Sequence, residues 1–138
     1  MGGAVVERVK QDAASVVQNL PDAHASWQLW RNARFRAAVG RIDASIYSID
    51  AERYTETQLE LLREAALLVS SAVRIHTSSL GAGVRDEVDR QFYRQVTERL
   101  KEAADCFERG ESPNPDKRPS DDTRLERFGE GLRRANLA

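Results

Sequence analysis

Apolar residues recur at alternating spacings of three and four along residues 59–80 of this chain. Such spacing places side chains on one face of an α-helix. The positions are Leu59, Leu62, Ala66, Val69, Val73, His76 and Leu80. A second apolar row runs beside the first, at Leu61, Ala65, Leu68, Ala72 and Ile75. Because the two rows together cover more than half of the circumference, we expect this helix to be the central, most buried element.

The start of this helix is the best-specified boundary in the sequence. Thr55 can cap it while Gln58 reciprocates three residues later, and Tyr54 and Leu59 can form a hydrophobic staple. The helix should end at Gly81 or Gly83, because glycine adopts left-handed conformations without steric cost.

The same period appears in three further segments, and no alternating run of β-branched residues interrupts them. We expect one helix over 4–20, stopped by Pro21, because the residue before a proline is pushed out of the α region. Two more should span 23–49 and 84–107, the last ending before Gly110. Their apolar positions are Val5, Val9, Ala13, Val16, Val17 and Leu20; Trp27, Trp30, Phe35, Val39, Ile42, Ile46 and Ile49; and Val84, Val88, Phe92, Val96, Leu100, Ala104 and Phe107. The sequence therefore predicts an all-α fold with a four-helix antiparallel bundle core, over residues 1–110.

Residues 111–122 carry three prolines and no large apolar side chain, which predicts a flexible, Pro-rich linker. Beyond it, Thr123 and Glu126 form a second capping box, and residues 123–138 form a short tethered amphipathic helix. An isolated helix of this length is marginal in water, so its apolar stripe needs a surface to fold against. The stripe consists of Leu125, Phe128, Leu132 and Ala135. We expect Leu125, Phe128 and Leu132 to bind either the chain's own bundle or a partner protein.

Length and charge exclude several classes of protein. A chain of 138 residues is one domain by the usual prior, and with a net charge of −1 it is not a generally basic, polyanion-binding protein. It has a single cysteine, no charged-then-apolar leader and no long apolar run. We therefore expect a soluble, cytoplasmic protein without a membrane partner.

His76 stands on the apolar seam, where a metal ligand, a catalytic base and a core histidine would look alike. A metal site needs several convergent ligands, and His24 and Cys106 are not at a diagnostic spacing. The serines and threonines around His76 show no triad or nucleophile pattern. We therefore expect a structural, hydrogen-bonded core histidine, and no metal, no cofactor and no catalytic residue, so the chain is predicted not to be an enzyme.

Residues 24–50 hold a local excess of positive charge, with four arginines against Asp43 and Asp50, giving +2. Arginines interleaved with aromatic residues can contact nucleic acid, here through Arg31, Arg34 and Arg41, since Arg36 points away from the others. The same segment suits a protein interface at Trp30. The charged residues of 85–109 mix both signs and include like-charged neighbours such as Arg90 and Arg94, which indicates a solvated outer face.

No family motif is recognisable in the sequence. The function that it favours is a non-enzymatic helical-bundle interaction module, which is a self-associating small subunit or an adaptor within a larger assembly. Its partner would be another protein or a second copy of the chain. The alternative is a nucleic-acid-contacting small helical subunit of a nucleoprotein complex that uses the arginines of residues 24–50.

Overall fold

The computed structural model describes residues 2–25, 29–81 and 84–114. This part of the chain contains the α-helices α1 (Gly2–Ala25), α2 (Leu29–Tyr47), α3 (Glu56–Ser79) and α4 (Val84–Glu108), with a 3-10 turn η1 (Ala51–Arg53) before α3. It contains no strand, so the all-α prediction is confirmed. The predicted helix over 123–138 and Trp27 lie outside the described residues.

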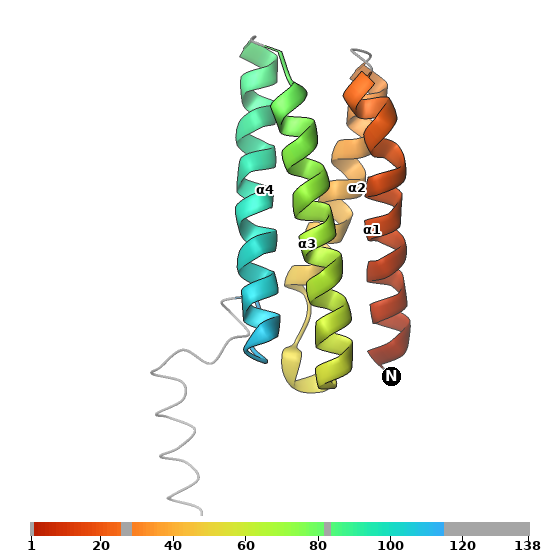
Figure 1. The fold of residues 1–138 in the computed structure, drawn as a ribbon, viewed down its shortest axis with the longest axis vertical. Helices are drawn as coiled ribbons and strands as arrows, with labels where there is room; N and C mark the ends of the chain where they lie inside the picture. The colour runs from red at the N-terminus through yellow and green to blue at the C-terminus, as the bar shows by residue number, and fades with distance from the viewer. Residues whose placement is uncertain (1, 26–28, 82–83, 115–138) are drawn as a thin grey trace, which may run out of the picture.

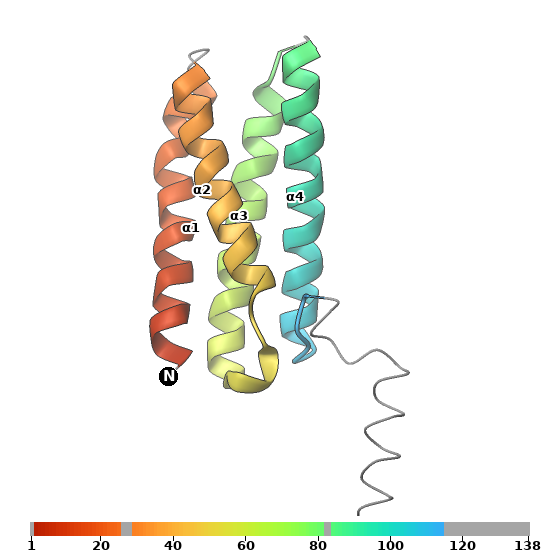
Figure 2. The same cartoon turned by 180° about the vertical axis from the view of Figure 1, so that it is seen from behind.

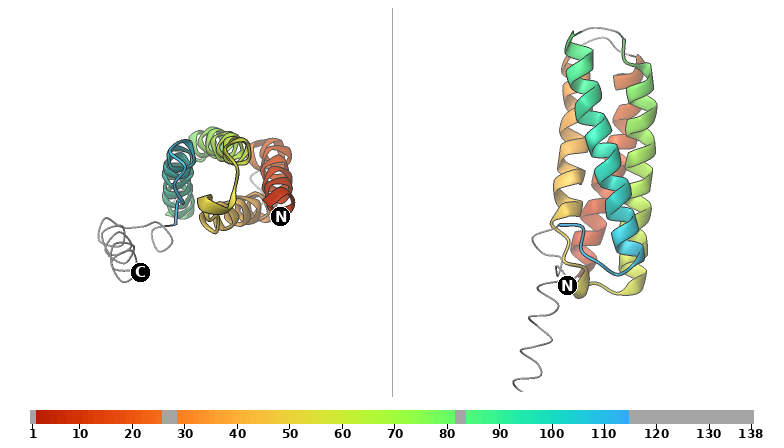
Figure 3. Two further views of the ribbon diagram at one scale, coloured as in Figure 1. Left: turned by 90° about the horizontal axis from the view of Figure 1, so that it is seen from below. Right: turned by 90° about the vertical axis from the view of Figure 1, so that its left-hand side faces the viewer.

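Consecutive helices run in opposite directions, which makes two hairpins, α1–α2 and α3–α4 (Figures 1 and 2). The hairpins lie side by side, so that α1 packs along α3 (Figure 3). α2 lies next to α4 with much sparser packing. Since α1 and α3 both run upward in Figure 1, and α2 and α4 both run downward, these neighbours are parallel. A bundle that is antiparallel at every neighbouring pair is therefore not confirmed.

The segment that joins α2 to α3 crosses the lower end of the bundle and closes it (Figure 3). Ile49 and Ala51 in this segment are buried and belong to the core. The core is otherwise built from one face of each helix, and its largest fully buried side chains are Tyr93, Phe35, Ile42, Ile46, Ile49, Leu62 and Leu100. The apolar positions predicted from Phe35 to Ile49 are thus confirmed as buried, although α2 itself ends at Tyr47.

The predicted start of α3 is also confirmed. The Gln58 backbone N–H donates to Thr55 Oγ1 at 3.1 Å, and the Thr55 N–H donates to Gln58 Oε1 at 2.9 Å. Tyr54 and Leu59 both pack on the core. The capping box satisfies two N–H groups that the first helical turn leaves without partners, which fixes this boundary locally.

Three other helix boundaries differ from the prediction. α1 continues through Pro21 to Ala25, because a proline near the end of a helix removes one backbone bond while the continued turn buries Ala23. As a result, the second helix begins at Leu29 and not at residue 23. α3 ends at Ser79 with Leu80 as an extended cap, so Gly81 is not used for a left-handed turn, and Gly83 lies outside the described residues.

α4 ends where expected, because Gly110 has a φ of +72° and turns the chain back on the bundle. The Glu111 N–H donates to the Cys106 carbonyl at 2.8 Å. Ser112 is buried, and its Oγ accepts a 2.8 Å hydrogen bond from the Ala51 N–H of η1. Ser112 therefore packs against η1, although it lies at the start of the segment predicted as a flexible linker.

Replacing Ser112 with alanine should lower the free energy of unfolding by about 1–3 kcal/mol, because the buried Ala51 N–H loses its acceptor. Urea denaturation followed by circular dichroism measures this difference. Ser71→Ala is the matched control, since Ser71 is exposed on α3 and should change stability by less than about 0.5 kcal/mol. Equal effects of the two substitutions would contradict the role given to Ser112.

Candidate functional site

An apolar row lies open to solvent along the α1 side of α3. Leu61, Leu68 and Ile75 are seven residues apart, which places them on one side of the helix. Leu68 is 50% and Ile75 is 52% exposed, while Leu61 is half-buried. The prediction that this row is buried is therefore wrong for Leu68 and Ile75. The physical reason is that α3 packs mainly against α1 and α4, so its outermost sector has no helix over it.

Between α1 and α3, this row borders a shallow hollow of about 180 Å³. Its lining residues are Lys10, Ala13, Leu61, Glu64, Ala65 and Leu68. Ala13 and Ala65 are buried, whereas Leu61 is half-buried and Leu68 is exposed. Val17, also on α1, adds a further exposed apolar side chain. A small apolar hollow between leucines is the shape that accepts a leucine from another helix.

Trp30, at the start of α2, is a second exposed apolar residue, 54% accessible to solvent. The guanidinium carbon of Arg31 lies 5.1 Å from its ring centroid and that of Arg34 lies 5.8 Å away. Both distances are typical of cation–π contacts. The structure thus brings Trp30, Arg31 and Arg34 together. Arg41 lies about two helical turns further along α2, so it is not part of this cluster.

The three α2 arginines proposed to contact nucleic acid are not equally accessible. Arg34 and Arg41 are exposed, whereas Arg31 is half-buried. Arg36, expected to point elsewhere, turns toward α4, where its Nη1 pairs with Asp89 Oδ1 at 3.1 Å and its guanidinium lies 4.6 Å from the Phe92 ring centroid.

A similar contact joins α4 back to α2. Arg99 Nε pairs with Asp43 Oδ1 at 3.3 Å, and its guanidinium carbon lies 4.2 Å from the Tyr47 ring centroid. Burial raises the pKa of the Asp43 carboxyl above its ordinary value, although Arg99 opposes this shift. These arginines therefore fasten α2 to α4 along their sparsely packed boundary.

His76 is a core residue, only 1% exposed. Its ring packs between Phe35, at a centroid distance of 4.6 Å, and Tyr93, at 5.0 Å. Phe35 and Tyr93 are themselves 5.8 Å apart, so three rings from α2, α3 and α4 form one aromatic cluster. Within residues 2–25, 29–81 and 84–114, no three His, Cys, Asp or Glu side chains are placed to hold a metal ion. The predicted partner-binding residues of the C-terminal segment, Leu125, Phe128 and Leu132, lie outside those ranges.

Comparison with protein-family models, with curated proteins and with solved structures finds no match. Among the described helices, none is both long and apolar enough to cross a membrane.

Proposed function

We propose that this chain is a non-enzymatic, self-associating helical module that serves as a small subunit or adaptor in a larger assembly. The observation that carries the proposal is the row of Leu61, Leu68 and Ile75, of which Leu68 and Ile75 are exposed, beside the hollow that Ala13 and Ala65 help to line. Covering an exposed apolar row with another surface is favourable, because removing apolar area from water lowers the free energy.

A second copy of the chain is the occupant that this surface fits. Large residues at 61, 68 and 75 alternate with alanines at 65 and 72, so the row supplies both protruding side chains and the gaps between them. Under a two-fold axis, Leu68 of each copy enters the hollow of the other, and one patch serves both sides. The small residues let the two α3 helices approach closely, as knobs-into-holes packing requires.

Light scattering on the purified full-length chain tests this proposal. The wild-type protein should have a mass near 31 kDa, which is twice the 15.5 kDa of one chain. Leu68→Glu should give a particle of 15.5 kDa, because burying an unpaired carboxylate in the interface is strongly unfavourable.

The matched control for that experiment is Val88→Glu, which places the same charge on an equally exposed valine of α4. This variant should stay dimeric. A monomeric wild-type protein at its highest soluble concentration, or the same mass for both variants, would contradict self-association through α3.

The C-terminal segment supplies a further partner-binding candidate, through Leu125, Phe128 and Leu132. Truncation after Asn114 keeps the Ser112 contact and removes this segment. If α3 carries self-association, the truncated chain should remain dimeric and lose only the capture of other proteins. A monomeric truncated chain would instead assign the dimer contact to the C-terminal segment.

Trp30 with Arg31 and Arg34 is the surface that we assign to a protein partner, since tryptophan and arginine are enriched among the residues that dominate interface energies. Nucleic-acid contact through Arg31, Arg34 and Arg41 stays an alternative prediction. The exposure of Arg34 and Arg41 favours it. Arg34→Gln combined with Arg41→Gln tests it through the affinity for single-stranded DNA.

A further inference from the structure

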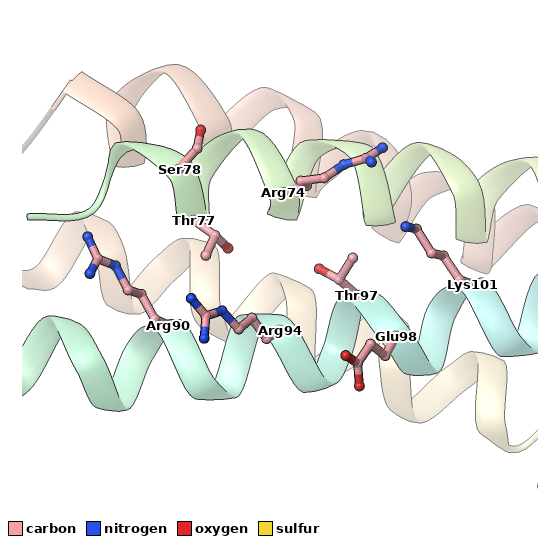
Figure 4. A pocket seen from close by; sticks show the side chains of 8 residues that line it. All are labelled: Arg74, Thr77, Ser78, Arg90, Arg94, Thr97, Glu98 and Lys101. Atoms are coloured by element: carbon pink, nitrogen blue, oxygen red, sulfur yellow. The ribbon is translucent and has the colours of Figure 1, made fainter.

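A groove runs between α3 and α4 (Figure 4). None of its lining residues belongs to the row of Leu61, Leu68 and Ile75, called the Leu68 row below. Its volume is about 460 Å³, which is within the range of ligand-binding clefts. Its lining residues are Arg74, Thr77 and Ser78 of α3, and Arg90, Arg94, Thr97, Glu98 and Lys101 of α4. Four cationic side chains thus face one carboxylate, a local net charge of +3.

Most of these cations are not neutralised by the protein itself. Within the described part of the chain, no ion pair involves Arg74, Arg94 or Lys101. α3 has no acidic residue between Ala65 and its end. Arg90 donates a hydrogen bond to the Leu80 carbonyl, which holds it at the end of α3. Like charges gathered in this way repel one another, so an anion in the groove is favoured.

The cations form a row and not a single point. Arg90, Arg94 and Lys101 lie within a twelve-residue stretch of α4, a length of about 16 Å. Arg74 approaches from α3, and in Figure 4 its guanidinium lies at the same end of the groove as the Lys101 amine. One phosphate group would meet only one or two of these side chains, whereas the phosphates of a nucleic-acid strand follow one another about 3.4 Å apart along a duplex axis. A strand therefore matches the length of the row.

The uncharged lining residues indicate how such a ligand would be recognised. The hydroxyls of Thr77, Ser78 and Thr97 donate to carbonyls of their own helices, at 2.7, 2.8 and 2.8 Å. Their protons are therefore already used. The lining also contains no aromatic ring on which a base can stack. Recognition is left to the charges, which contact phosphates and do not read the base sequence.

We infer that the α3–α4 groove binds the sugar–phosphate backbone of a nucleic-acid strand without sequence preference. Arg74, Arg94 and Lys101 hold successive phosphates, and Arg90 contributes positive charge at the end of α3. Glu98 weakens the attraction of the groove for the phosphates. The site shares no residue with the Leu68 row, so it does not depend on the proposed self-association.

Fluorescence anisotropy with a labelled, mixed-sequence single-stranded DNA tests this inference on the full-length chain. Binding should be measurable at about 50 mM salt, and four phosphate contacts should give a log–log salt slope of about 3. Arg94→Gln combined with Lys101→Gln should bind about tenfold more weakly and halve that slope, since two contacts are lost. Arg74→Gln, from the other wall of the groove, should weaken binding independently, and Glu98→Gln should strengthen it.

The control with the same change in charge is Arg34→Gln combined with Arg41→Gln on α2, which should bind within about twofold of the wild type. A larger loss in this control than in the groove variants would overturn the inference in favour of α2. Absence of a wild-type complex at about 50 mM salt would also overturn it.

Two competitors identify the ligand chemistry. Polyglutamate that displaces the DNA as well as unlabelled strand does would show that any polyanion is accepted, which contradicts a phosphodiester site. Inorganic tripolyphosphate that binds as tightly as the strand would assign the groove to a small phosphate compound instead. Leu68→Glu should leave DNA affinity per chain unchanged, so the failure of either proposal is recognised separately.

Discussion

Replacing Phe35 with alanine should lower the free energy of unfolding by about 3–5 kcal/mol. Phe35 has no exposed surface, and its ring contacts His76 and Tyr93 at centroid distances of 4.6 and 5.8 Å. The substitution removes an aromatic ring from the junction of α2, α3 and α4, and the helices around it can collapse only in part. Urea denaturation measures the loss, and a shift in the midpoint without a change in the slope would show that the fold is retained.

Phe92→Ala is the control for this prediction. Phe92 is only partly buried, and Arg36 covers its ring from the side of α2, so its loss should cost clearly less. If the two substitutions were equally costly, or if Phe35→Ala cost less than about 1 kcal/mol, the aromatic cluster would not be the centre of the core.

Features set by interactions within a few residues were predictable from the sequence. The capping box at Thr55 and Gln58 is local, and so is the end of α4 before Gly110, and both lie where the sequence predicts them. The period of three and four gave the helical class and the buried face of α2 for the same reason. Each of these features depends on residues that are close in sequence and not on contacts between helices.

Features set by neighbouring helices were not predictable in this way. Periodicity shows that Leu61, Leu68 and Ile75 share a side of α3, but not whether another helix covers that side. In the bundle, the contacts of α3 with α1 and α4 leave Leu68 and Ile75 in solvent. Pro21 is similar, because the stop expected from its backbone chemistry is overridden where the extra turn of α1 buries Ala23.

The α3–α4 groove was missed because its residues are distant in sequence. Arg74 meets Arg94 and Lys101 only through the pairing of α3 with α4. On its own, the mixture of positive and negative charges on α4 indicated a solvated face. Two signals were nevertheless present: the absence of acids from Ala65 to Leu80, and the like-charged pair Arg90 and Arg94. Together they point to a surface where positive charge is retained.

Tyr93→Phe should leave stability at pH 7 unchanged or slightly increased, but should protect the protein strongly in alkali. The Tyr93 hydroxyl is buried and has no hydrogen-bond partner among the described residues. Removing it at neutral pH therefore leaves no other polar group without a hydrogen bond. Burial raises the pKa of this phenol well above its ordinary value of 10.0, the Asp89 charge adds to the shift, and Arg36 opposes it.

The sign of the pH dependence follows from that shift. Because the folded pKa of Tyr93 is raised, its neutral form stabilises the fold fully below about pH 10, and this contribution is lost as the pH rises toward the folded pKa. The wild-type protein should therefore lose up to about 1.4 kcal/mol per pH unit more than Tyr93→Phe does, or about 2–3 kcal/mol by pH 12. Urea denaturation of both proteins between pH 8 and 12 measures the difference. In contrast, Tyr47→Phe should destabilise the protein already at pH 7, by about 0.5–1.5 kcal/mol, because the Tyr47 hydroxyl donates to the Arg99 carbonyl at 2.9 Å. Parallel pH profiles for the wild type and Tyr93→Phe would mean that this phenol ionises as readily in the folded chain as in the unfolded one.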